Sequence, residues 1–458
     1  MLVLAHHFPP IGGVVGRNVA TARYLPKFGY DAMVVTGPGE SAGRWAPRDA
    51  ELLERVVHVP IKRLPGPVPA PREGVRARVA RWTERRPPWV DWWVRGAISA
   101  ARELEGEFDV VLANLIPYET AEAASVIAAE LGVPWVADLE DPWALDEMRV
   151  HPTALNHWID SRHMRRALDS AAALIMSCPE AAERVRREIP EWGDKIVTSI
   201  AHGFNADDYS GPDPKRSGSS FRIVHTGALH TELGRDHRRT RPLRRLLGGT
   251  SLDVDILTRS HAYLIEALHR VAAARPELAE RVELNFVGRL TPVDREVASR
   301  HPRVQEHGQL PHGETIALAR SADLLFLPTH DLPPGARAGI VPCKTYEYLA
   351  TGHPILAAVC DGDARDLLER FARASICRPS DVDGMAAAIV AAIEDSDSGD
   401  AQDSAPTLAE TELLARYERR HLTGEIAAVL DDARGMARTP LAGSAASHGR
   451  PLHLASAG

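Results

Sequence analysis

The chain has 458 residues, of which 44% are hydrophobic and 25% are charged, and this composition is typical of a globular protein with two domains. Its formal net charge of −8 argues against a general nucleic-acid-binding protein, because neutralising phosphates requires a basic surface. No run of about 18 uncharged apolar residues occurs, and the start MLVLAHHFPP lacks a basic leader. We therefore expect a cytoplasmic protein.

The first part of the chain alternates short apolar runs with amphipathic segments. We interpret six runs as buried parallel strands: MLVLAHH, DAMVVTG, VVHVPI, FDVVLAN, PWVADL and ALIMSC. Segments between them, such as NVATARYLPKFG and TAEAASVIAAELG, end at a glycine, where a helix should stop. This βαβ repetition predicts a doubly wound parallel sheet over residues 1–208.

A glycine-rich turn, IGGVVG, follows the first predicted strand and contains Gly12 and Gly13. A dinucleotide site would need an acidic residue at the end of the second strand, and DAMVVTG has none, so a nicotinamide cofactor is not expected. A turn with so little side-chain bulk lets backbone amides approach an anion or a sugar. The alternative is a tight turn with a structural role alone.

Residues 61–95 combine basic side chains with Trp82, Trp89, Trp92 and Trp93. Such a segment can rest on an anionic membrane or grip a lipid-linked substrate, which would place the protein at the inner membrane face. We favour the other interpretation, an exposed helix whose tryptophans pack on the sheet, because tryptophan is usually mostly buried.

The alternation breaks at YSGPDPKRSGSS, residues 209–220, which we interpret as a linker. It restarts with FRIVHTGAL, LDVDIL, VELNFVG, ADLLFLPT and HPILAAV, the predicted strands of a second α/β domain over residues 221–405. Residues 406–438 are predicted to be helical and residues 439–458 to be disordered. A ligand would bind in the cleft between the domains, at the carboxyl ends of the strands.

The segment GIVPCKTYEYLATGHPILA predicts a helix that begins near residues 341–344. A helix amino end beside Lys344 is suited to a diphosphate, and Glu347 can accept two hydroxyls of a ribose. The alternative is that Lys344 and Glu347 form only an exposed helical pair at i and i+3.

An ordered set of motifs resembles family 4 glycosyltransferases, which are retaining, use nucleotide sugars and have the GT-B architecture of two Rossmann-like domains. The motifs, which span about residues 1–395, are FPPIGG, YLPKFGY, PWVADLEDPW, GFNADDY, HTGAL and PCKTYEYLATGHPIL. The resemblance implies the transfer of a sugar to the hydroxyl of a glycan, a lipid-linked acceptor or a small molecule. It implies front-face departure and attack, with no cofactor, no metal and no protein nucleophile.

The resemblance also assigns roles by position. In the loop HTELGRDHRRTRP we choose Arg239 to neutralise the diphosphate, with Arg235 and Arg238 as competitors. The implied catalytic residues are Lys344, Arg239 and Asp138. The implied nucleotide and donor site comprises Gly12, Gly13, Gly227, Val341, Pro342, Cys343 and Glu347. The implied acceptor contacts are Asp141 and Asn114.

The chain departs from the family pattern at Gly339, where many relatives have the first of two glutamates eight residues apart. The missing glutamate makes a partner protein without activity conceivable, and a second enzyme class on the same scaffold is a further alternative. A nucleotide-sugar 2-epimerase or hydrolase would use His6, His7, Asp138 and Glu140. A sugar-nucleotide-binding partner would have no activity of its own. The Asp-x-Asp of LDVDIL is interpreted as two residues alternating along a strand, not as a metal site, and the four cysteines have no metal-ligand spacing.

Overall fold

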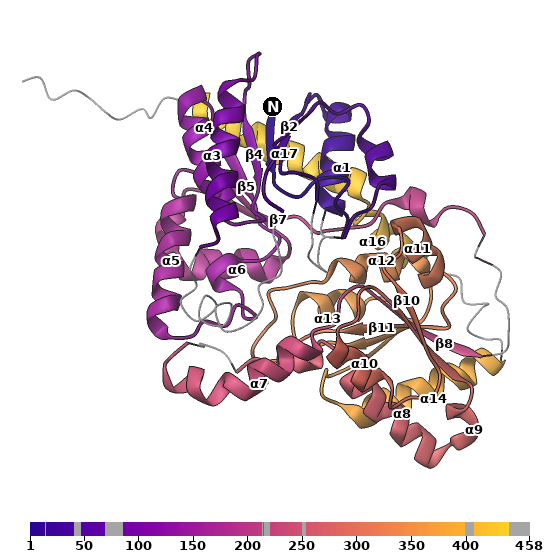
Figure 1. Cartoon of the computed structure of the whole chain (residues 1–458). Coiled ribbons are helices and arrows are strands. Elements are labelled where there is room, and N and C mark those ends of the chain that lie inside the picture. Colours follow the sequence, from indigo (N-terminus) through magenta and orange to yellow (C-terminus); the bar gives the residue numbers. More distant parts are fainter. Residues whose placement is uncertain are drawn as a thin grey trace, which may run out of the picture.

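The computed structural model describes residues 1–13, 15–40, 47–68, 86–212, 214, 220–249, 253–398 and 407–438. Within them lie two separate parallel β-sheets with helices packed around them (Figure 1). This confirms the predicted α/β class with two doubly wound sheets.

The first sheet has the strand order β3-β2-β1-β4-β5-β6-β7, so the order reverses between β1 and β4. Its strands are short and mostly buried, as the continuous apolar runs predict. They are β1 (Leu2–Ala5), β2 (Met33–Thr36), β3 (Ile61–Arg63), β4 (Val111–Asn114), β5 (Trp135–Asp138), β6 (Ala173–Met176) and β7 (Ile196–Ser199). Its helices are α1 (Gly16–Tyr24), α3 (Pro88–Arg102), α4 (Thr120–Leu131), α5 (Ala154–Leu168) and α6 (Pro179–Glu188).

The second sheet has the strand order β10-β9-β8-β11-β12-β13, with its reversal between β8 and β11. The strands are β8 (Phe221–Thr226), β9 (Val282–Val287), β10 (Val304–Gly308), β11 (Leu324–Pro328), β12 (Ile355–Ala358) and β13 (Ala374–Cys377). The helices are α7 (Thr231–Leu246), α8 (Ala262–Ala274), α9 (Pro276–Ala279), α10 (Pro292–Ala298), α11 (His312–Ala319), α12 (Cys343–Thr351), α13 (Asp363–Leu368) and α14 (Val382–Ser398).

Two further helices, α16 (Leu408–Ala415) and α17 (Arg419–Arg438), follow the second sheet. The last of these returns to the first domain, where Leu422, Ile426 and Leu430 join the apolar cluster beneath α1 and β1. Figure 1 shows this yellow helix running across the first domain and behind α1. The end of the chain therefore reinforces the domain that contains its beginning.

Several predicted helix ends are confirmed by their glycines. Gly132 and Gly352 cap α4 and α12 with φ of +68° and +71°, a left-handed conformation that glycine adopts without steric cost. The helix α12 begins at Cys343, within the predicted range.

Three predicted elements are wrong. In place of the strand VVHVPI, the segment Glu51–Val56 is a 3-10 turn and β3 begins only at Ile61. LDVDIL is not a sheet strand: β8 pairs directly with β9, and Ile256–Thr258 is a 3-10 turn. The segment HTELGRDHRRTRP, expected as a loop, lies in α7.

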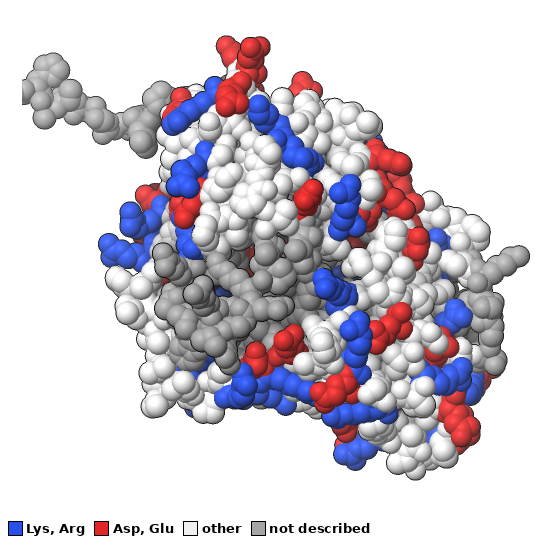
Figure 2. All heavy atoms as spheres, in the orientation of Figure 1, with Lys and Arg blue, Asp and Glu red and all other residues white. Residues whose placement is uncertain are grey.

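Charged side chains of both signs are interspersed over the face in Figure 2. No helix among the described residues is long and apolar enough to span a bilayer.

Candidate functional site

The amino end of α12 places Lys344 beside the turn that follows β8. Lys344 Nζ lies 3.3 Å from His225 Nε2, and His225 Nδ1 donates to the carbonyl of Phe326 at 2.9 Å. The lysine therefore donates to a neutral imidazole. A Cβ added to Gly227, whose φ is +92°, would lie 3.2 Å from Lys344 Nζ, so this glycine leaves open space beside the ammonium group.

A second cation, Arg259, lies near Lys344 and was missed by the sequence analysis. It follows the 3-10 turn Ile256–Thr258 and directs Nη1 to Met148 Sδ at 3.1 Å. Burial and the charge of Arg259 lower the pKa of Lys344 to about 7. Neither cation has a carboxylate within 4 Å among the described residues; at longer range Glu347 acts on Lys344, and Asp141 and Asp146 act on Arg259. The signal in the sequence was the arginine of TRSH, directly before α8.

The arginine chosen from the sequence, Arg239, lies elsewhere. It sits on α7 as an exposed side chain and pairs with Asp236 at i and i+3. Arg235 pairs with Glu296, and Arg238 pairs with Asp255. The prediction that these arginines occupy a phosphate-facing loop is wrong, because the segment is helical and its side chains have their own acidic partners.

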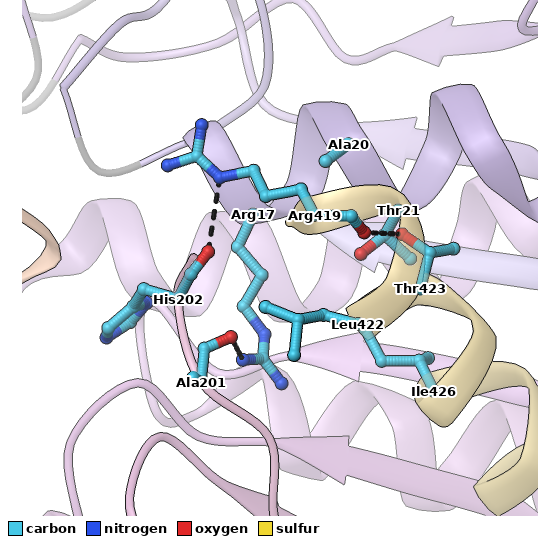
Figure 3. Close-up of a pocket in the computed structure, with 9 residues that line it drawn as sticks. All are labelled: Arg17, Ala20, Thr21, Ala201, His202, Arg419, Leu422, Thr423 and Ile426. Carbon is cyan, nitrogen blue, oxygen red and sulfur yellow. Dashed lines mark hydrogen bonds between the residues drawn. The ribbon is translucent and has the colours of Figure 1, made fainter. Parts of the chain in front are cut away.

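Glu347 lies on α12, half-buried, with Oε1 3.6 Å from Arg419 Nη2 at the start of α17. Arg419 Nε also donates to the carbonyl of His202 at 3.1 Å, and Figure 3 shows this contact beside Arg17. A Cβ added to Gly16 would lie 2.8 Å from Arg419 Nη2. Arg419, the first residue of α17, therefore orients the Glu347 carboxylate, the candidate ribose-binding group. Local sequence patterns did not indicate this contact.

Asp138 is buried in a pair with Arg17 and is not the free carboxylate that a catalytic or acceptor role requires. Arg17 Nε donates to Asp138 Oδ2 at 2.9 Å, and Nη2 lies 2.9 Å from Oδ1. Arg17 Nη1 donates to the carbonyls of Ile200 and Ala201. The structure corrects the predicted role of Asp138: the pair joins α1 to the ends of β5 and β7.

Four polar side chains follow, or end, four adjacent strands of the first sheet. His6, Asn114, Glu140 and Ser177 stand at the carboxyl ends of β1, β4, β5 and β6, and each is at least nine-tenths buried. Each of these side chains has buried polar atoms that make no hydrogen bond with the described residues: both ring nitrogens of His6, the amide oxygen and nitrogen of Asn114, Glu140 Oε1 and Ser177 Oγ. Buried polar groups without partners are rare, so this edge is suited to a polar ligand.

Burial determines the protonation states of the side chains at this edge of the first sheet. It raises the pKa of Glu140 to about 8, with added repulsion from Asp141 and Asp138. It lowers the pKa of His6 to about 3. Burial also raises the pKa of Asp141, which is half-buried between this edge and the side of Arg259. At neutral pH the edge thus presents a neutral imidazole and a largely protonated Glu140.

The remaining predicted residues are placed as follows. Gly12 donates its N–H to the carbonyl of Pro47 at 2.6 Å, and an added Cβ would lie 2.9 Å from Asp49 Cβ, so its smallness serves packing. Gly13 is exposed with φ of +70°. Val341 and Pro342 are buried immediately before α12, and Cys343 is half-buried at its first position.

Of the basic aromatic segment, residues 69–85 lie outside the described part of the chain. Trp93 is fully buried on α3, and the His6 ring lies 5.0 Å from Trp89 and 5.1 Å from Trp93. The described tryptophans therefore pack against the sheet, as we favoured.

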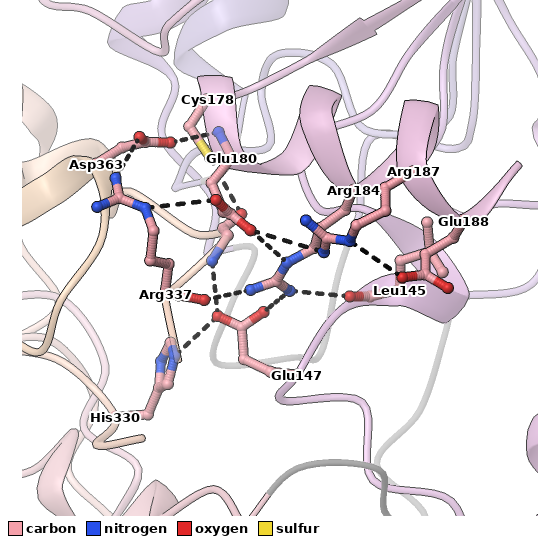
Figure 4. A network of polar contacts seen from close by, with 11 residues as sticks. Leu145, Glu147, Cys178, Glu180, Arg184, Arg187, Glu188, His330, Arg337 and Asp363 are labelled. Atoms are coloured by element: carbon pink, nitrogen blue, oxygen red, sulfur yellow. Dashed lines mark hydrogen bonds and ion pairs between the residues drawn. The ribbon is translucent and has the colours of Figure 1, made fainter. Parts of the chain in front are cut away.

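A separate polar network joins the two domains near Gly339 (Figure 4). Glu147 Oε1 accepts from His330 Nε2 and from the Gly339 N–H, both at 2.9 Å, and Oε2 pairs with Arg184. A Cβ added to Gly339 would lie 2.9 Å from Arg184 Cζ, so the guanidinium occupies the space of a larger side chain. Cys178 Sγ donates to the Gly339 carbonyl at 3.1 Å. The network fixes the segment that leads into α12.

Burial alone would raise the pKa of Glu147, but the hydrogen bond from His330 and the charges of His330 and Arg184 bring it down to about 2. Because both carboxylate oxygens have partners, this network has a structural role. Among the described residues, no group of three or more His, Cys, Asp or Glu side chains is arranged to hold a metal ion. Asp253 and Asp255 pair with Arg241 and Arg238 of α7.

The two halves of the chain match two families of glycosyltransferase domains. Residues 12–198 match the family described as glycosyl transferase 4-like domain, and residues 256–395 match the family described as glycosyl transferases group 1. The first match covers the first sheet except β1 and the end of β7, and the second includes β9 to β13 and α12. No curated protein matches the chain.

Solved structures with similar folds cover nearly all of the chain. The HepE protein of Anabaena, in complex with UDP and glucose, is 16% identical with a TM-score of 0.59, over 94% of this chain and 99% of its own. A trehalose 6-phosphate synthase of Burkholderia multivorans is 13% identical with a TM-score of 0.60, over 95% and 99%. An E. coli protein bound with UDP-2-fluoro glucose is 12% identical with a TM-score of 0.55, over 94% and 98%. These likenesses establish the GT-B fold.

Proposed function

We propose that this chain, which is built from two glycosyltransferase domains, transfers a sugar from a nucleoside-diphosphate sugar to an acceptor hydroxyl with retention of anomeric configuration. The observation that carries the proposal is the pair of cations at α12. Arg259 is close enough to Lys344 to lower its pKa, neither cation has a carboxylate within 4 Å among the described residues, and Lys344 lies beside an exposed glycine, Gly227. A diphosphate would supply the missing negative charge.

The donor is expected to lie along α12. The backbone N–H groups of Val341 and Cys343, at the positive end of the helix, would face the diphosphate, while Glu347 would accept the ribose hydroxyls. Arg419 holds Glu347 Oε1 from the side and limits its rotation. Because similar folds are solved with UDP or UDP-sugars, UDP-glucose is the first donor to test.

The acceptor is expected at the carboxyl edge of the first sheet. His6, Asn114, Glu140 and Ser177 together offer donors and acceptors to a molecule with several hydroxyls. Asp141 and Asn114 keep their proposed acceptor role, and Glu140, His6 and Ser177 join them. Asp138, which the resemblance implied to be catalytic, is not included because its oxygens already face Arg17.

Transfer would break the bond between the anomeric carbon and the diphosphate oxygen and form a bond from that carbon to the acceptor oxygen on the same face. The acceptor proton would pass to the leaving phosphate oxygen. Lys344, Arg259 and the helix amino end would stabilise the negative charge that grows on the leaving group. No group of the protein has to form a covalent intermediate.

Incubation with UDP-, GDP- and TDP-glucose, with and without a panel of hydroxyl acceptors, tests the proposal. Nucleotide release that depends on the acceptor, with an anomerically retained product by NMR, is the expected result. Isomerised donor would identify an epimerase, and release without acceptor a hydrolase. Donor binding by thermal shift without turnover would identify a partner protein without activity.

A further inference from the structure

Large apolar side chains are exposed along two neighbouring helices. On α5 these are Leu155, Trp158 and Ile159, and at the end of α7 and just beyond it they are Leu243, Leu246 and Leu247. Their exposed fractions lie between 40% and 82%. On each helix they follow the spacing i, i+3, i+4, so each set forms a stripe on one helical face. Both stripes point away from the core.

The two stripes adjoin. The N–H of Ala154 at the start of α5 donates to the carbonyl of Leu247 at 2.9 Å, and the N–H of His151 donates to the carbonyl of Gly249 at 3.2 Å. Arg244 Nη1 donates to the carbonyl of Val150 at 2.8 Å. We call the six side chains the α5–α7 patch. It crosses from one domain to the other, and both helices lie at the lower left edge of Figure 1.

Arginines surround this patch. The helices α5 and α7 contain nine arginines, and five of them pair with carboxylates: Arg165, Arg235, Arg238, Arg239 and Arg241. Arg162, Arg166 and Arg245 form no ion pair with the described residues, and the Arg162 guanidinium lies 5.5 Å from the centre of the Trp158 ring. In Figure 2 the edge over α5 shows blue and red atoms among white ones, and a blue and red band lies over α7.

We propose that the α5–α7 patch docks on the surface of an anionic lipid bilayer. The apolar stripes would enter the interfacial region, while the unpaired arginines would contact lipid phosphates. A second copy of the chain fits less well, because a two-fold interface would place the arginines of one patch against those of the other. The proposal is independent of the sugar-transfer chemistry and concerns a surface distinct from residues 61–95.

Co-sedimentation of the full chain with vesicles tests this docking. With vesicles that contain about one-third phosphatidylglycerol in phosphatidylcholine, we expect binding at least about tenfold tighter than with phosphatidylcholine alone. The double substitution Trp158→Ser and Leu246→Ser should weaken binding to the anionic vesicles by about tenfold or more. The triple substitution Arg162→Gln, Arg166→Gln and Arg245→Gln should weaken it by a similar factor.

The matched control is the double substitution Val57→Ser and Leu408→Ser, which removes two other strongly exposed apolar side chains (83% and 75%) outside the patch and should leave vesicle binding unchanged. Unchanged circular dichroism and melting temperature will show that each variant is folded. The proposal is overturned if the wild-type chain does not bind anionic vesicles at low salt, or if the patch variants bind as the control does. A dimer in sedimentation velocity that Leu246→Ser dissociates would identify a second copy as the occupant instead.

Discussion

Two clusters of ionisable side chains lie where the domains meet, and they differ in whether their charges have partners. In the network of Figure 4, the Glu147 carboxylate has His330, Arg184 and the Gly339 N–H as partners. At the start of α12, Lys344 has only the neutral His225 as a side-chain hydrogen-bond partner among the described residues, and Arg259 has only the Met148 sulfur. The first cluster holds the domains together, whereas the second keeps its charge available for a ligand.

The largest expected effect is a loss of protein stability when the Glu147 network is broken. Glu147→Ala would remove one of the two carboxylates that pair with the buried Arg184, leaving Glu180 at 3.3 Å, and would also remove the partner of His330. It should lower the free energy of unfolding by about 3–5 kcal/mol, measured by urea denaturation. Because the folded-state pKa of Glu147 lies below its unfolded value, its contribution should be present above pH ~4.5 and lost as pH falls toward 2. An Ala variant as stable as wild type at pH 7 would contradict the structural role.

Removing a charge from the second cluster, at the start of α12, should lower turnover and not stability. Lys344→Ala should lower kcat by about 10²–10³-fold, as expected for a group that stabilises a leaving diphosphate. Its melting temperature should not fall, because the substitution removes a cation that has no acidic partner. Arg239→Ala, the matched control on α7, should change neither quantity. A Lys344→Ala variant with a lower melting temperature and an unchanged kcat would mean that Lys344 is structural and does not act on the leaving group.

A smaller effect is expected on nucleotide affinity. Glu347→Ala should raise the Kd for UDP by about 10–100-fold, the cost of losing charged hydrogen bonds to a ribose. Isothermal titration calorimetry measures this change, and Glu347→Gln should keep part of the affinity. If Glu347 serves only as the partner of Arg419, the Ala variant will bind UDP normally and melt at a lower temperature.

The smallest effect is on the pH dependence of binding. Burial and Arg259 bring the pKa of Lys344 to about 7, and the diphosphate requires the protonated form. UDP affinity should therefore fall above pH ~7, by up to about tenfold per pH unit, until the pKa of the complex is reached. Titrations between pH 6 and 9, compared with those of Lys344→Arg, test this sign. A flat profile for the wild type would mean that Lys344 does not contact the nucleotide.

Local patterns were sufficient for most of the fold. Continuous apolar runs identified β1, β2, β4, β5, β6, β8, β9, β11 and β12, because strands of a parallel sheet are covered on both faces. The runs that became β7, β10 and β13 are partly exposed and carry polar residues, so no such signal existed. The helix α7 was missed because the resemblance implied a loop after HTGAL and because the internal Pro242 is unfavourable in a helix, although arginine itself is a good helix former.

In the candidate site, too, local sequence indicated some residues and distant contacts decided the others. Lys344 and Glu347 lie in one helix with its own amino end, so local sequence could suggest a phosphate and ribose site, with an exposed helical pair as the alternative. The pairing of Asp138 with Arg17 spans 121 positions, and that of Glu147 with Gly339 spans 192. Local periodicity carries no information about such distant partners, so Asp138 was assigned a chemical role and Arg259 was overlooked.

The sequence by itself determined the two α/β halves, the glycines that end the helices and the amino end of α12, because these depend on neighbours a few positions away. Only the tertiary structure decided which charges are neutralised. Arg17 pairs with Asp138, Arg419 pairs with Glu347, and both Arg184 and His330 pair with Glu147. Among the described residues, Lys344 and Arg259 have no carboxylate within 4 Å. A charge becomes structural or available for a ligand according to what folding brings within about 4 Å of it, and that is a property of the packed chain.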